Sequence, residues 1–482
     1  MLAVAHLLGL MMAFFGLIYL LPIAWSLAVS DGAVMDFVIA GGINIVAGLL
    51  IAGLTKRFRR ELKPRDGFLL VTSSWVLMSA SAAIPLMIAL PDLSFTDAYF
   101  EAMSGLTTTG STVLSQLDDL PQSINIWRHT LHWLGGIGII VLVVAVLPLL
   151  GVGGMQLYKA ETPGPVKDEK LTPRITETAK ALWFTYLAIS VLGIMGLRIA
   201  GMSWFDAVCH GFSAIALGGF SSHDVSVGYF ESVGVELVLI VIMVVATLNF
   251  SRHFLAFRNL SFKPYKTDSE AKAVLIVLGV SVMLVSFVLW ADGTYPTSLE
   301  GFRHSVFNVI SIATTTGFVT EDYEKWPAFL PMWLIFLSCI TCSTGSTGGG
   351  IKMFRTLLLV RQARRELKQL VHPNAVIPIR IGGQAVPERV VYSVLAFIFL
   401  YFGTILVLAF AQLAAGLDLV SAFSSVVSSI NNMGPGLGAV GPSTNFQALT
   451  DVQTWICTAA MLIGRLEVFT VLVLFTAGFW RK

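Results

Sequence analysis

Four short segments of this chain end in the same way, and this repeat constrains the fold more than any other feature. The segments read AMSGLTTTG, GFSAIALGG, VISIATTTG and VVSSINNMG, and they end at Gly110, Gly219, Gly317 and Gly434. Six residues before each glycine there is a serine, preceded by an apolar residue: Ser104, Ser213, Ser311 and Ser428 follow Met103, Phe212, Ile310 and Val427. Because long apolar stretches flank every segment, the sequence predicts a helix–loop–helix unit repeated four times in one chain.

Composition places these units in a membrane. Hydrophobic residues make up 55% of the 482 residues and charged residues 12%, whereas a soluble domain carries about 25% charge. About 20 apolar residues suffice to cross a bilayer. We expect ten spans, at 4–30, 34–54, 67–91, 129–157, 179–201, 232–256, 272–292, 329–361, 388–416 and 452–480. The first span follows no basic leader and no clear cleavage site, so we interpret it as a retained helix.

Four less apolar segments lie between the spans, at about 95–109, 205–218, 299–315 and 418–432. They are too short to cross a membrane, and each fits a re-entrant half-helix. The predicted fold is an all-α polytopic membrane protein with two leading helices and four pseudo-repeated helix–pore loop–helix units around one central pore. We assign the leading helices to 1–66, the first three repeats to 67–157, 158–256 and 257–361, and a cytoplasmic linker with the fourth repeat to 362–482.

The distribution of charge predicts the orientation. If the spans alternate in direction, the loops near 55–66, 158–180, 252–272 and 352–389 share one side with both termini. That side holds 26 lysines and arginines, and the opposite side holds four. Positive charge marks the cytoplasmic side, so both termini are expected there. Acidic residues favour the outer side, where together they would raise the local cation concentration, although any one of them can simply accompany the charge bias: Asp118, Asp119, Asp224, Glu231, Glu321, Asp322 and Glu324.

The glycine loops suit a cation filter. A potassium ion sheds water in a narrow path, and backbone carbonyls aimed at one axis can replace that water. Half-helix C-terminal ends carry partial negative charge and favour a cation at the midplane. A small-residue packing motif, the alternative, leaves the half-helices unexplained. We predict that potassium binds at Thr107, Thr108, Thr109 and Gly110, at Ala216, Leu217, Gly218 and Gly219, at Thr314, Thr315, Thr316 and Gly317, and at Asn431, Asn432, Met433 and Gly434.

These loops resemble a known family when three further motifs are added: HWLGGIG at 132–138, STGSTGGGIK at 343–352 and GRLEVF at 464–469. Over essentially its whole length the chain resembles the pore subunits of bacterial Trk potassium uptake systems, of the TrkH type within the Trk/Ktr/HKT superfamily. The two leading helices resemble the TrkH type more than Ktr. The resemblance implies potassium uptake across the bacterial cytoplasmic (inner) membrane, a homodimer, and a cytosolic regulatory subunit that binds nucleotides.

The resemblance also bears on ion selectivity. In plant relatives, a serine in place of the first filter glycine is associated with sodium preference, and here Gly110 and the other three glycines are present. Potassium is therefore the expected ion. Loops two and four depart from the threonine-rich form, so a sodium-permeable or sodium-coupled transporter of the same superfamily remains an alternative.

A glycine-rich stretch interrupts the expected span 329–361 and predicts a gate. It runs from Ser343 to Gly350, and three consecutive glycines disfavour a helix. Unwound backbone at membrane depth occurs only where it lines a cavity or is covered by protein. We expect this stretch to face the pore just inside the filter and to gate it, with a static kink as the alternative. The gating glycines would be Gly345, Gly348, Gly349 and Gly350.

Arg465 lies in the middle of the last expected span, where an ionisable side chain is costly and usually faces a polar interior. We expect it to face the pore beneath the filter and to hinder cations or hold the glycine-rich stretch. The resemblance also places an arginine at the constriction. Glu467, two residues on, points to another face and would pair elsewhere, with Lys352 as the candidate. A structural ion pair without a role in conduction is the alternative.

A polytopic membrane enzyme is the alternative function from a class other than transport. It would need a nucleophile–base pair or a histidine-rich cluster within the spans, and none stands out. We therefore expect no enzymatic activity, no cofactor in this chain, potassium only as a substrate, and no nucleic-acid partner. GSTGGGIK lacks the spacing of a phosphate-binding loop, so any ATP use would reside in a partner.

Several other residues have a plain structural interpretation. His129 and His132 lack a third metal ligand and are expected to pack. The cysteines at 209, 339, 342 and 457 are expected to be buried thiols. A basic run would form either a lipid-facing collar or a docking site for a cytosolic partner: Arg361, Arg364, Arg365 and Lys368.

Overall fold

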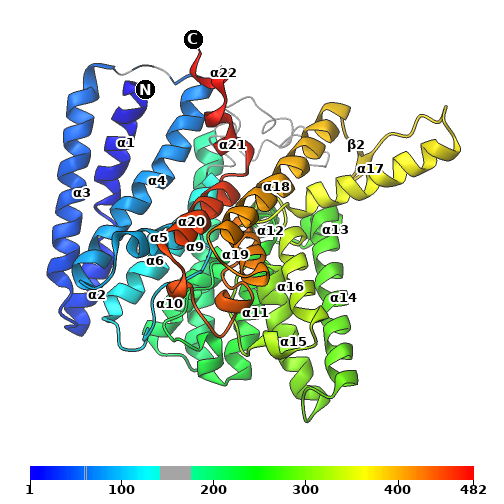
Figure 1. The fold of residues 1–482 in the computed structure, drawn as a ribbon, viewed down its shortest axis with the longest axis horizontal. Helices are drawn as coiled ribbons and strands as arrows, with labels where there is room; N and C mark the ends of the chain where they lie inside the picture. Colours follow the sequence, from blue (N-terminus) through cyan, green and yellow to red (C-terminus); the bar gives the residue numbers. More distant parts are fainter. Residues whose placement is uncertain (59, 61, 142–174, 482) are drawn as a thin grey trace.

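A computed structural model describes residues 1–58, 60, 62–141 and 175–481, and these are almost entirely helical (Figure 1). The end of the expected span 129–157 and most of the expected inner loop 158–180 lie outside the described residues. Within the described part, the strands form one small antiparallel hairpin of β1 (Arg380–Ile381) and β2 (Gln384–Ala385). Both chain termini lie at the same end of the molecule (Figure 1).

The leading helices form one flank of the molecule (Figure 1). They are α1 (Leu2–Phe15), α2 (Leu20–Val29) and α3 (Val34–Thr55). Tyr19, between α1 and α2, stacks on Trp127 of the first repeat with ring centroids 4.4 Å apart. Its hydroxyl donates a hydrogen bond to the carbonyl oxygen of Ser81 at 2.8 Å. The flank is therefore packed onto the first repeat by a buried aromatic cluster.

Four units of long helix, half-helix and second helix follow. The first contains α4 (Pro64–Ala89), α5 (Phe95–Leu106) and α6 (Gln122–Val141). The second contains α9 (Ile175–Ile199), α10 (Trp204–Ala216), α11 (Val233–Thr247), α12 (Phe250–Asn259) and the short α13 (Lys263–Thr267). The third contains α14 (Ser269–Asp292), α15 (Ser298–Ala313), α16 (Phe329–Ile340) and α17 (Met353–Val371). The fourth contains α18 (Glu388–Ala414), α19 (Leu419–Asn431), α20 (Asp451–Arg465), α21 (Phe469–Leu472) and α22 (Ala477–Trp480).

The half-helices α5, α10, α15 and α19 start at polar caps. The side chains of Ser94, Ser203, Thr297 and Asp418 each accept a hydrogen bond from a backbone N–H in the first turn. The helices contain 12, 13, 16 and 13 residues, so at about 1.5 Å per residue they are shorter than the roughly 30 Å of a bilayer core. Each ends just before its glycine loop, as the sequence predicts for a re-entrant segment.

The second long helix bends in the later repeats, and two of these bends were not predicted. The expected single helix 232–256 is broken into α11 and α12, which meet at 101°. The expected helix 452–480 is broken after α20, with a bend of 107°. Asn249 explains the first break, because its side chain caps a new helix by accepting from Ser251 N–H. At the second break Glu467 has a φ of +54°, which no continuous helix allows.

Six described helices are long and apolar enough to cross a membrane, and the count is eight if each bent pair is one span. The other two expected spans contain the interruption between α16 and α17 and the part of 129–157 outside the described residues. Large apolar side chains face outward from the long helices. On α14, Val280, Met283 and Phe287 are 62%, 65% and 60% exposed, which suits contact with lipid rather than with water.

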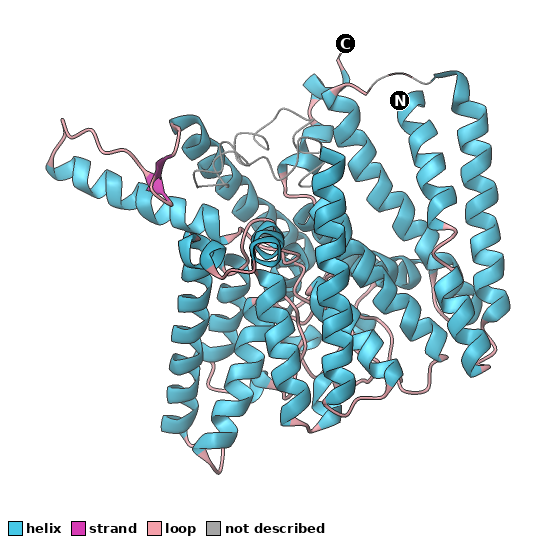
Figure 2. Ribbon diagram, turned by 180° about the vertical axis from the view of Figure 1, so that it is seen from behind, coloured by secondary structure: helices cyan, strands magenta, loops and turns pink. Residues whose placement is uncertain are grey.

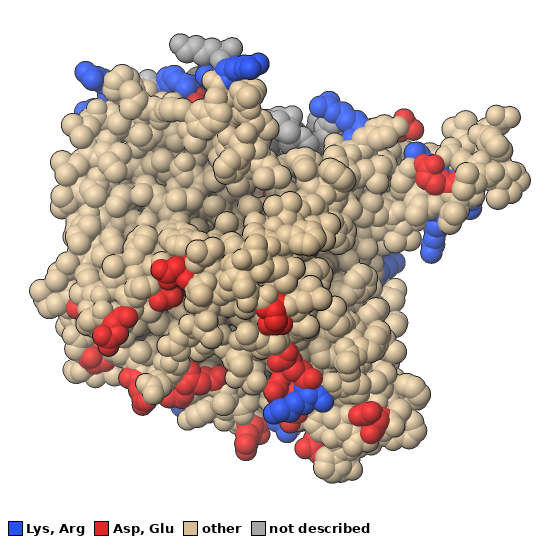
Figure 3. Space-filling view, in the orientation of Figure 1, with Lys and Arg blue, Asp and Glu red and all other residues tan. Residues whose placement is uncertain are grey.

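Charged side chains gather at opposite ends of the molecule. On the face drawn in Figure 3, most lysines and arginines lie at the end with both termini and along α17, whereas most aspartates and glutamates lie at the other end. Helix α17 and the β1–β2 hairpin project from the body on the basic side (Figure 2). The charge asymmetry predicted from the loops is therefore present on this face of the molecule.

Candidate functional site

The four glycine loops close into a ring. A Cβ added at Gly110, Gly219, Gly317 or Gly434 would lie 2.0, 2.0, 2.1 or 3.1 Å from the carbonyl oxygen of Gly218, Thr316, Met433 or Thr109, respectively. Each glycine thus faces the residue that precedes the next glycine, in chain order, and the fourth loop returns to the first. All four glycines line one shared cavity of about 80 Å³.

The seam between the fourth and first loops is the widest of the four, and side chains close it. The amide of Asn432 donates to the Thr109 hydroxyl at 2.9 Å. The Ser111 hydroxyl donates to the carbonyl oxygen of Gly434 at 2.8 Å. The ring is therefore continuous, with backbone contact at three seams and side-chain hydrogen bonds at the fourth.

The loops share one backbone conformation although their side chains differ. The four glycines have φ of +84°, +80°, +88° and +98° in chain order. Two residues earlier, Thr108, Leu217, Thr315 and Asn432 all have φ between +52° and +60°, a region that residues with a side chain rarely adopt. The departures of loops two and four from the threonine-rich pattern therefore leave the path of the backbone unchanged.

The repeated serine has a geometric role. The N–H groups of Thr109, Gly218, Thr316 and Met433 donate to the carbonyl oxygens of Ser104, Ser213, Ser311 and Ser428 at 2.9, 2.9, 2.9 and 3.0 Å. This bond folds each loop back over the end of its half-helix. The serine is fully buried in all four cases. The constant spacing of six residues between serine and glycine follows from this turn.

Glycines from the three other motifs lie directly against the half-helix ends. A Cβ at Gly135 would lie 1.9 Å from the carbonyl oxygen of Leu106, and a Cβ at Gly464 would lie 1.9 Å from that of Ile430. At Gly349 the same atom would lie 1.9 Å from the carbonyl oxygen of Asn431. A side chain at any of these positions would collide with backbone beneath the ring. The motifs therefore provide close packing for the half-helix ends.

The glycine-rich stretch lies directly against the ring of loops. The N–H of Gly349 donates to the Thr315 hydroxyl at 3.0 Å. The Thr347 hydroxyl donates to the carbonyl oxygen of Ile215 at 3.0 Å, and the Lys352 ammonium donates to that of Gly348. The stretch thus contacts the second and third loops directly. Its role as a gate stays a prediction.

Two bent helices hold this stretch from either side. At the α11–α12 bend, Ser343 N–H donates to Thr247 oxygen at 3.0 Å, and Phe250 N–H donates to Gly345 oxygen at 3.1 Å. At the end of α20, the buried Arg465 guanidinium donates to the carbonyl oxygens of Thr347 and Gly135, each at 2.8 Å. The breaks in the second, third and fourth repeats therefore meet at one place beneath the ring.

The predicted partner of Glu467 was wrong. Glu467 forms an ion pair with Arg355 of α17, at 2.5 Å between Oε2 and Nη2, instead of with Lys352. The reason is that the Lys352 ammonium points back to Gly348, whereas Arg355 lies one turn along α17 and stacks over Phe397 at 4.2 Å. The bend after α20 is thus tied to the glycine-rich stretch through Arg465 and to α17 through Glu467.

The structure contains a buried ion pair, on the opposite side of the ring, that was not predicted from the sequence. Arg128 Nε lies 2.8 Å from Glu101 Oε1, and these side chains are 1% and 0% exposed. Arg128 also donates to the carbonyl oxygen of Ser221 at 3.3 Å, so it joins the segments that follow the first and second glycines. Charged residues inside apolar segments were the available signal. The pair braces two neighbouring loops.

Three histidines form hydrogen bonds with residues in and next to the second loop. His132 Nδ1 lies 2.8 Å from Ser213 Oγ, and His129 Nε2 lies 3.0 Å from the carbonyl oxygen of Phe220. His210 Nε2 lies 3.0 Å from Ser221 Oγ. His129 and His132 thus occupy packing positions with hydrogen-bond partners in the second loop.

The surroundings of His223, four residues after Gly219, predict a pH effect on stability. Its Nδ1 faces Asp118, its Nε2 lies 3.2 Å from Asp206 Oδ1, and Tyr229 and His210 stack against its ring. Burial lowers its pKa, but the two carboxylates outweigh burial and raise the pKa above 6.5. A histidine whose pKa is raised by folding stabilises the fold at pH values below its ordinary pKa. This stabilisation is lost as the pH rises through the pKa that the histidine has in the folded protein. Wild type should therefore lose more thermal stability between pH 6 and 8.5 than His223→Gln; parallel pH curves of the melting midpoint would contradict this.

Comparison with known proteins decides the family. The sequence model of the TrkH family, described as a cation transport protein, matches residues 33–482. The chain belongs to the TrkH family. It is 45% identical over 480 residues to the Trk system potassium uptake protein TrkH of Halomonas elongata, with 99% of each chain covered. It is 44% identical over 481 residues to the protein of that name from Escherichia coli K12, covering 100% of this chain and 99% of the other.

A solved member of the TrkH family has the same fold. The crystal structure of the potassium transporter TrkH from Vibrio parahaemolyticus matches with a TM-score of 0.92 and 41% identity, covering 100% of this chain and 99% of that one. The predicted family and the predicted all-helical polytopic architecture are therefore confirmed. This chain shares them with multi-pass membrane transport proteins of the TrkH family.

Proposed function

We propose that this chain carries potassium into the cell through the ring of four glycine loops. The observation that carries the proposal is the closed ring itself, in which four backbones of one conformation surround one axis. Backbone carbonyls at such an axis can replace the water of a cation, and the four half-helices end at the ring with their partial negative charge. The relatives named above as potassium uptake proteins support the choice of ion.

The filter would consist of the four strands that end at Gly110, Gly219, Gly317 and Gly434. The gate would be the glycine-rich stretch, closed when Arg465 holds Thr347 and Gly135. The guanidinium would then place a positive charge and a fixed loop directly beneath the ring. Release of these hydrogen bonds would let the stretch move aside, since glycine backbone has few steric limits.

The chain would lie in the bacterial inner membrane with both termini in the cytoplasm. The basic end of the molecule, which carries both termini, supports this orientation. Helix α17 and the β1–β2 hairpin project on that side, and they are candidates for docking a cytosolic nucleotide-binding regulatory subunit. Assembly as a homodimer rests on the family resemblance. The proposal requires no cofactor in this chain, and potassium is its substrate.

A sodium-permeable or sodium-coupled transporter is the second candidate, because loops two and four lack the threonines of loops one and three. The common backbone of all four loops favours potassium, since carbonyl oxygens rather than threonine side chains would face the ion. A membrane enzyme is disfavoured because the relatives are transport proteins.

Growth on limiting potassium tests the proposal. The chain is expressed in a bacterial strain that lacks its own potassium uptake systems but still produces the host regulatory subunit. We expect growth at submillimolar potassium, together with rubidium uptake that potassium inhibits. Growth only at high potassium, with membrane-inserted protein and no rubidium uptake, would overturn the proposal.

A further inference from the structure

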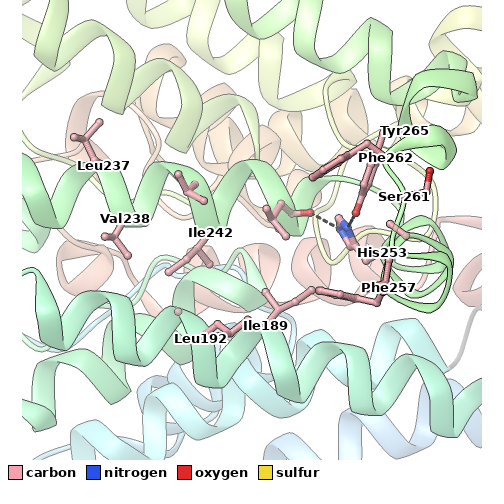
Figure 4. A pocket seen from close by; sticks show the side chains of 15 residues that line it. Ile189, Leu192, Leu237, Val238, Ile242, His253, Phe257, Ser261, Phe262 and Tyr265 are labelled. Carbon is pink, nitrogen blue, oxygen red and sulfur yellow. Dashed lines mark hydrogen bonds between the residues drawn. The ribbon is translucent and has the colours of Figure 1, made fainter.

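An apolar pocket lies on the surface of the second repeat, in the angle between α11 and α12 (Figure 4). Its volume is about 700 Å³, within the range of small-molecule sites. Ile189 and Leu192 of α9 form one wall, and Leu237 and Ile242 of α11 form another (Figure 4). Leu192 and Leu237 are 65% and 56% exposed, so the pocket opens on a surface that faces lipid in a membrane.

The bend between the two helices creates the pocket. Helix α11 has 15 residues and is therefore about 22 Å long, shorter than the roughly 30 Å of a bilayer core. Helix α12 leaves it at 101° and so runs across, rather than along, the direction of α11. His253 and Phe257 of α12, with Phe262 and Tyr265 beyond it, cover one end of the pocket (Figure 4). Because α11 is short, it does not fill the whole thickness of the hydrocarbon core. The remaining space beside it forms the pocket, and α12 lies across one end of that pocket.

The covering segment has the composition of a membrane interface. Phe257, Leu260 and Phe262 are 53%, 92% and 77% exposed. Exposed basic side chains alternate with them, at Arg258, Lys263 and Lys266. Segments that combine exposed aromatic and basic residues lie among lipid headgroups, and each Lys or Arg near the surface attracts anionic lipid.

The polar groups at the covered end are already satisfied. His253 Nδ1 lies 2.7 Å from the Tyr265 hydroxyl, and His253 Nε2 lies 2.9 Å from the carbonyl oxygen of Val245 (Figure 4). The rest of the lining is apolar apart from Ser261. A polar ligand would therefore find few partners inside, whereas a hydrocarbon chain would match the walls.

We propose that this pocket binds an acyl chain of an anionic phospholipid from the inner leaflet, with the headgroup held by the basic residues of the α12–α13 segment. The assignment to the inner leaflet rests on the orientation given under the proposed function. The site also adjoins the gate: Phe250, the first residue of α12, donates to Gly345, and Thr247 at the end of α11 accepts from Ser343. A bound lipid would stabilise the bend that holds the glycine-rich stretch.

Native mass spectrometry of the purified full chain tests the site, with dioleoyl phosphatidylglycerol and dioleoyl phosphatidylcholine as probes. Val241→Trp fills the pocket from a lining position on α11. Val280→Trp is the matched control, because Val280 is a similarly exposed residue of α14, at 62% against 61% for Val241, and does not line the pocket. We expect Val241→Trp to retain one phosphatidylglycerol fewer than wild type, and Val280→Trp to retain the same number.

A second pair of variants tests the headgroup. Arg258→Gln combined with Lys263→Gln should weaken phosphatidylglycerol retention by about tenfold, or about 1.4 kcal/mol, and leave phosphatidylcholine unchanged; Lys325→Gln, in an exposed acidic-side position, should change neither. Equal lipid retention in Val241→Trp and Val280→Trp would overturn the proposal. So would a loss of protomer association in Val241→Trp without a loss of lipid, which would make a second copy the occupant. These readouts do not depend on transport, so a failure here is distinct from a failure of the potassium proposal.

Discussion

Gly110→Ser is expected to remove most of the discrimination between potassium and sodium. A Cβ at this position would lie 2.0 Å from the carbonyl oxygen of Gly218, and the residue has a φ of +84°. The neighbouring loop must shift, because that oxygen is backbone and no rotamer can relieve the contact. Backbone strain of this kind costs about 1–3 kcal/mol, so the loops are expected to relieve it by moving, and a loss of about 1.4 kcal/mol of discrimination between the ions would be a factor of ten. The potassium-to-sodium flux ratio in liposomes should fall by about tenfold or more.

Gly434→Ser is the matched control for this prediction. It has the same left-handed backbone, with a φ of +98°, but its Cβ would lie 3.1 Å from the carbonyl oxygen of Thr109. The neighbour needs to move by only a few tenths of an ångström, so selectivity should fall less than in Gly110→Ser. If the two variants lose selectivity equally, the close contact at the first seam is not what sets it. If neither loses selectivity, the ring is not the filter.

Arg465→Ala is expected to raise potassium flux in the absence of any regulatory subunit. The substitution removes two hydrogen bonds, to Thr347 and Gly135, and one positive charge beneath the ring. A hydrogen bond from a charged donor contributes about 1.5–3 kcal/mol, so loss of one alone would shift the closed–open equilibrium by about tenfold. The measurement is the initial rate of potassium influx into liposomes that contain the purified variant.

Arg465→Lys separates the two ways in which the arginine could act. Lysine keeps the charge but lacks the planar fork that reaches two carbonyl oxygens at once. If the guanidinium acts by holding the glycine-rich stretch, the lysine variant should also conduct faster than wild type. If it acts only by charge, the lysine variant should behave as wild type. Unchanged flux in Arg465→Ala, with a normal melting midpoint, contradicts both.

The sequence was sufficient for the repeat and for the position of the glycine-rich stretch. The serine–glycine spacing follows from one local hydrogen bond, from Thr109 to Ser104 in the first loop, and local bonds leave a regular trace in sequence. The helix caps also leave a local pattern in the sequence, because Ser94 and Ser203 are each followed three residues later by an aspartate. This pattern would have predicted where the first two half-helices begin. Local features of this kind need no knowledge of the partner loop.

Other features were not predicted, and only the last of the three below depends on a contact between distant segments. The break at Asn249 lies inside an apolar run, and hydropathy alone favours a continuous helix there. Lys352 was the wrong partner for Glu467 because the turn that precedes α17 points its ammonium back at Gly348. The ion pair between Glu101 and Arg128 joins α5 to α6, and its two residues are 27 positions apart in the sequence. Such pairs become visible only when the loops meet.

The most direct test of the central claim is the ratio of potassium to sodium influx into liposomes that contain the purified chain. It is measured for wild type and for Arg465→Ala, so that a closed gate does not hide the path. A filter built from four carbonyl-lined loops predicts that potassium enters faster by at least about tenfold, or about 1.4 kcal/mol of discrimination. Sodium influx equal to or faster than potassium influx would contradict the account.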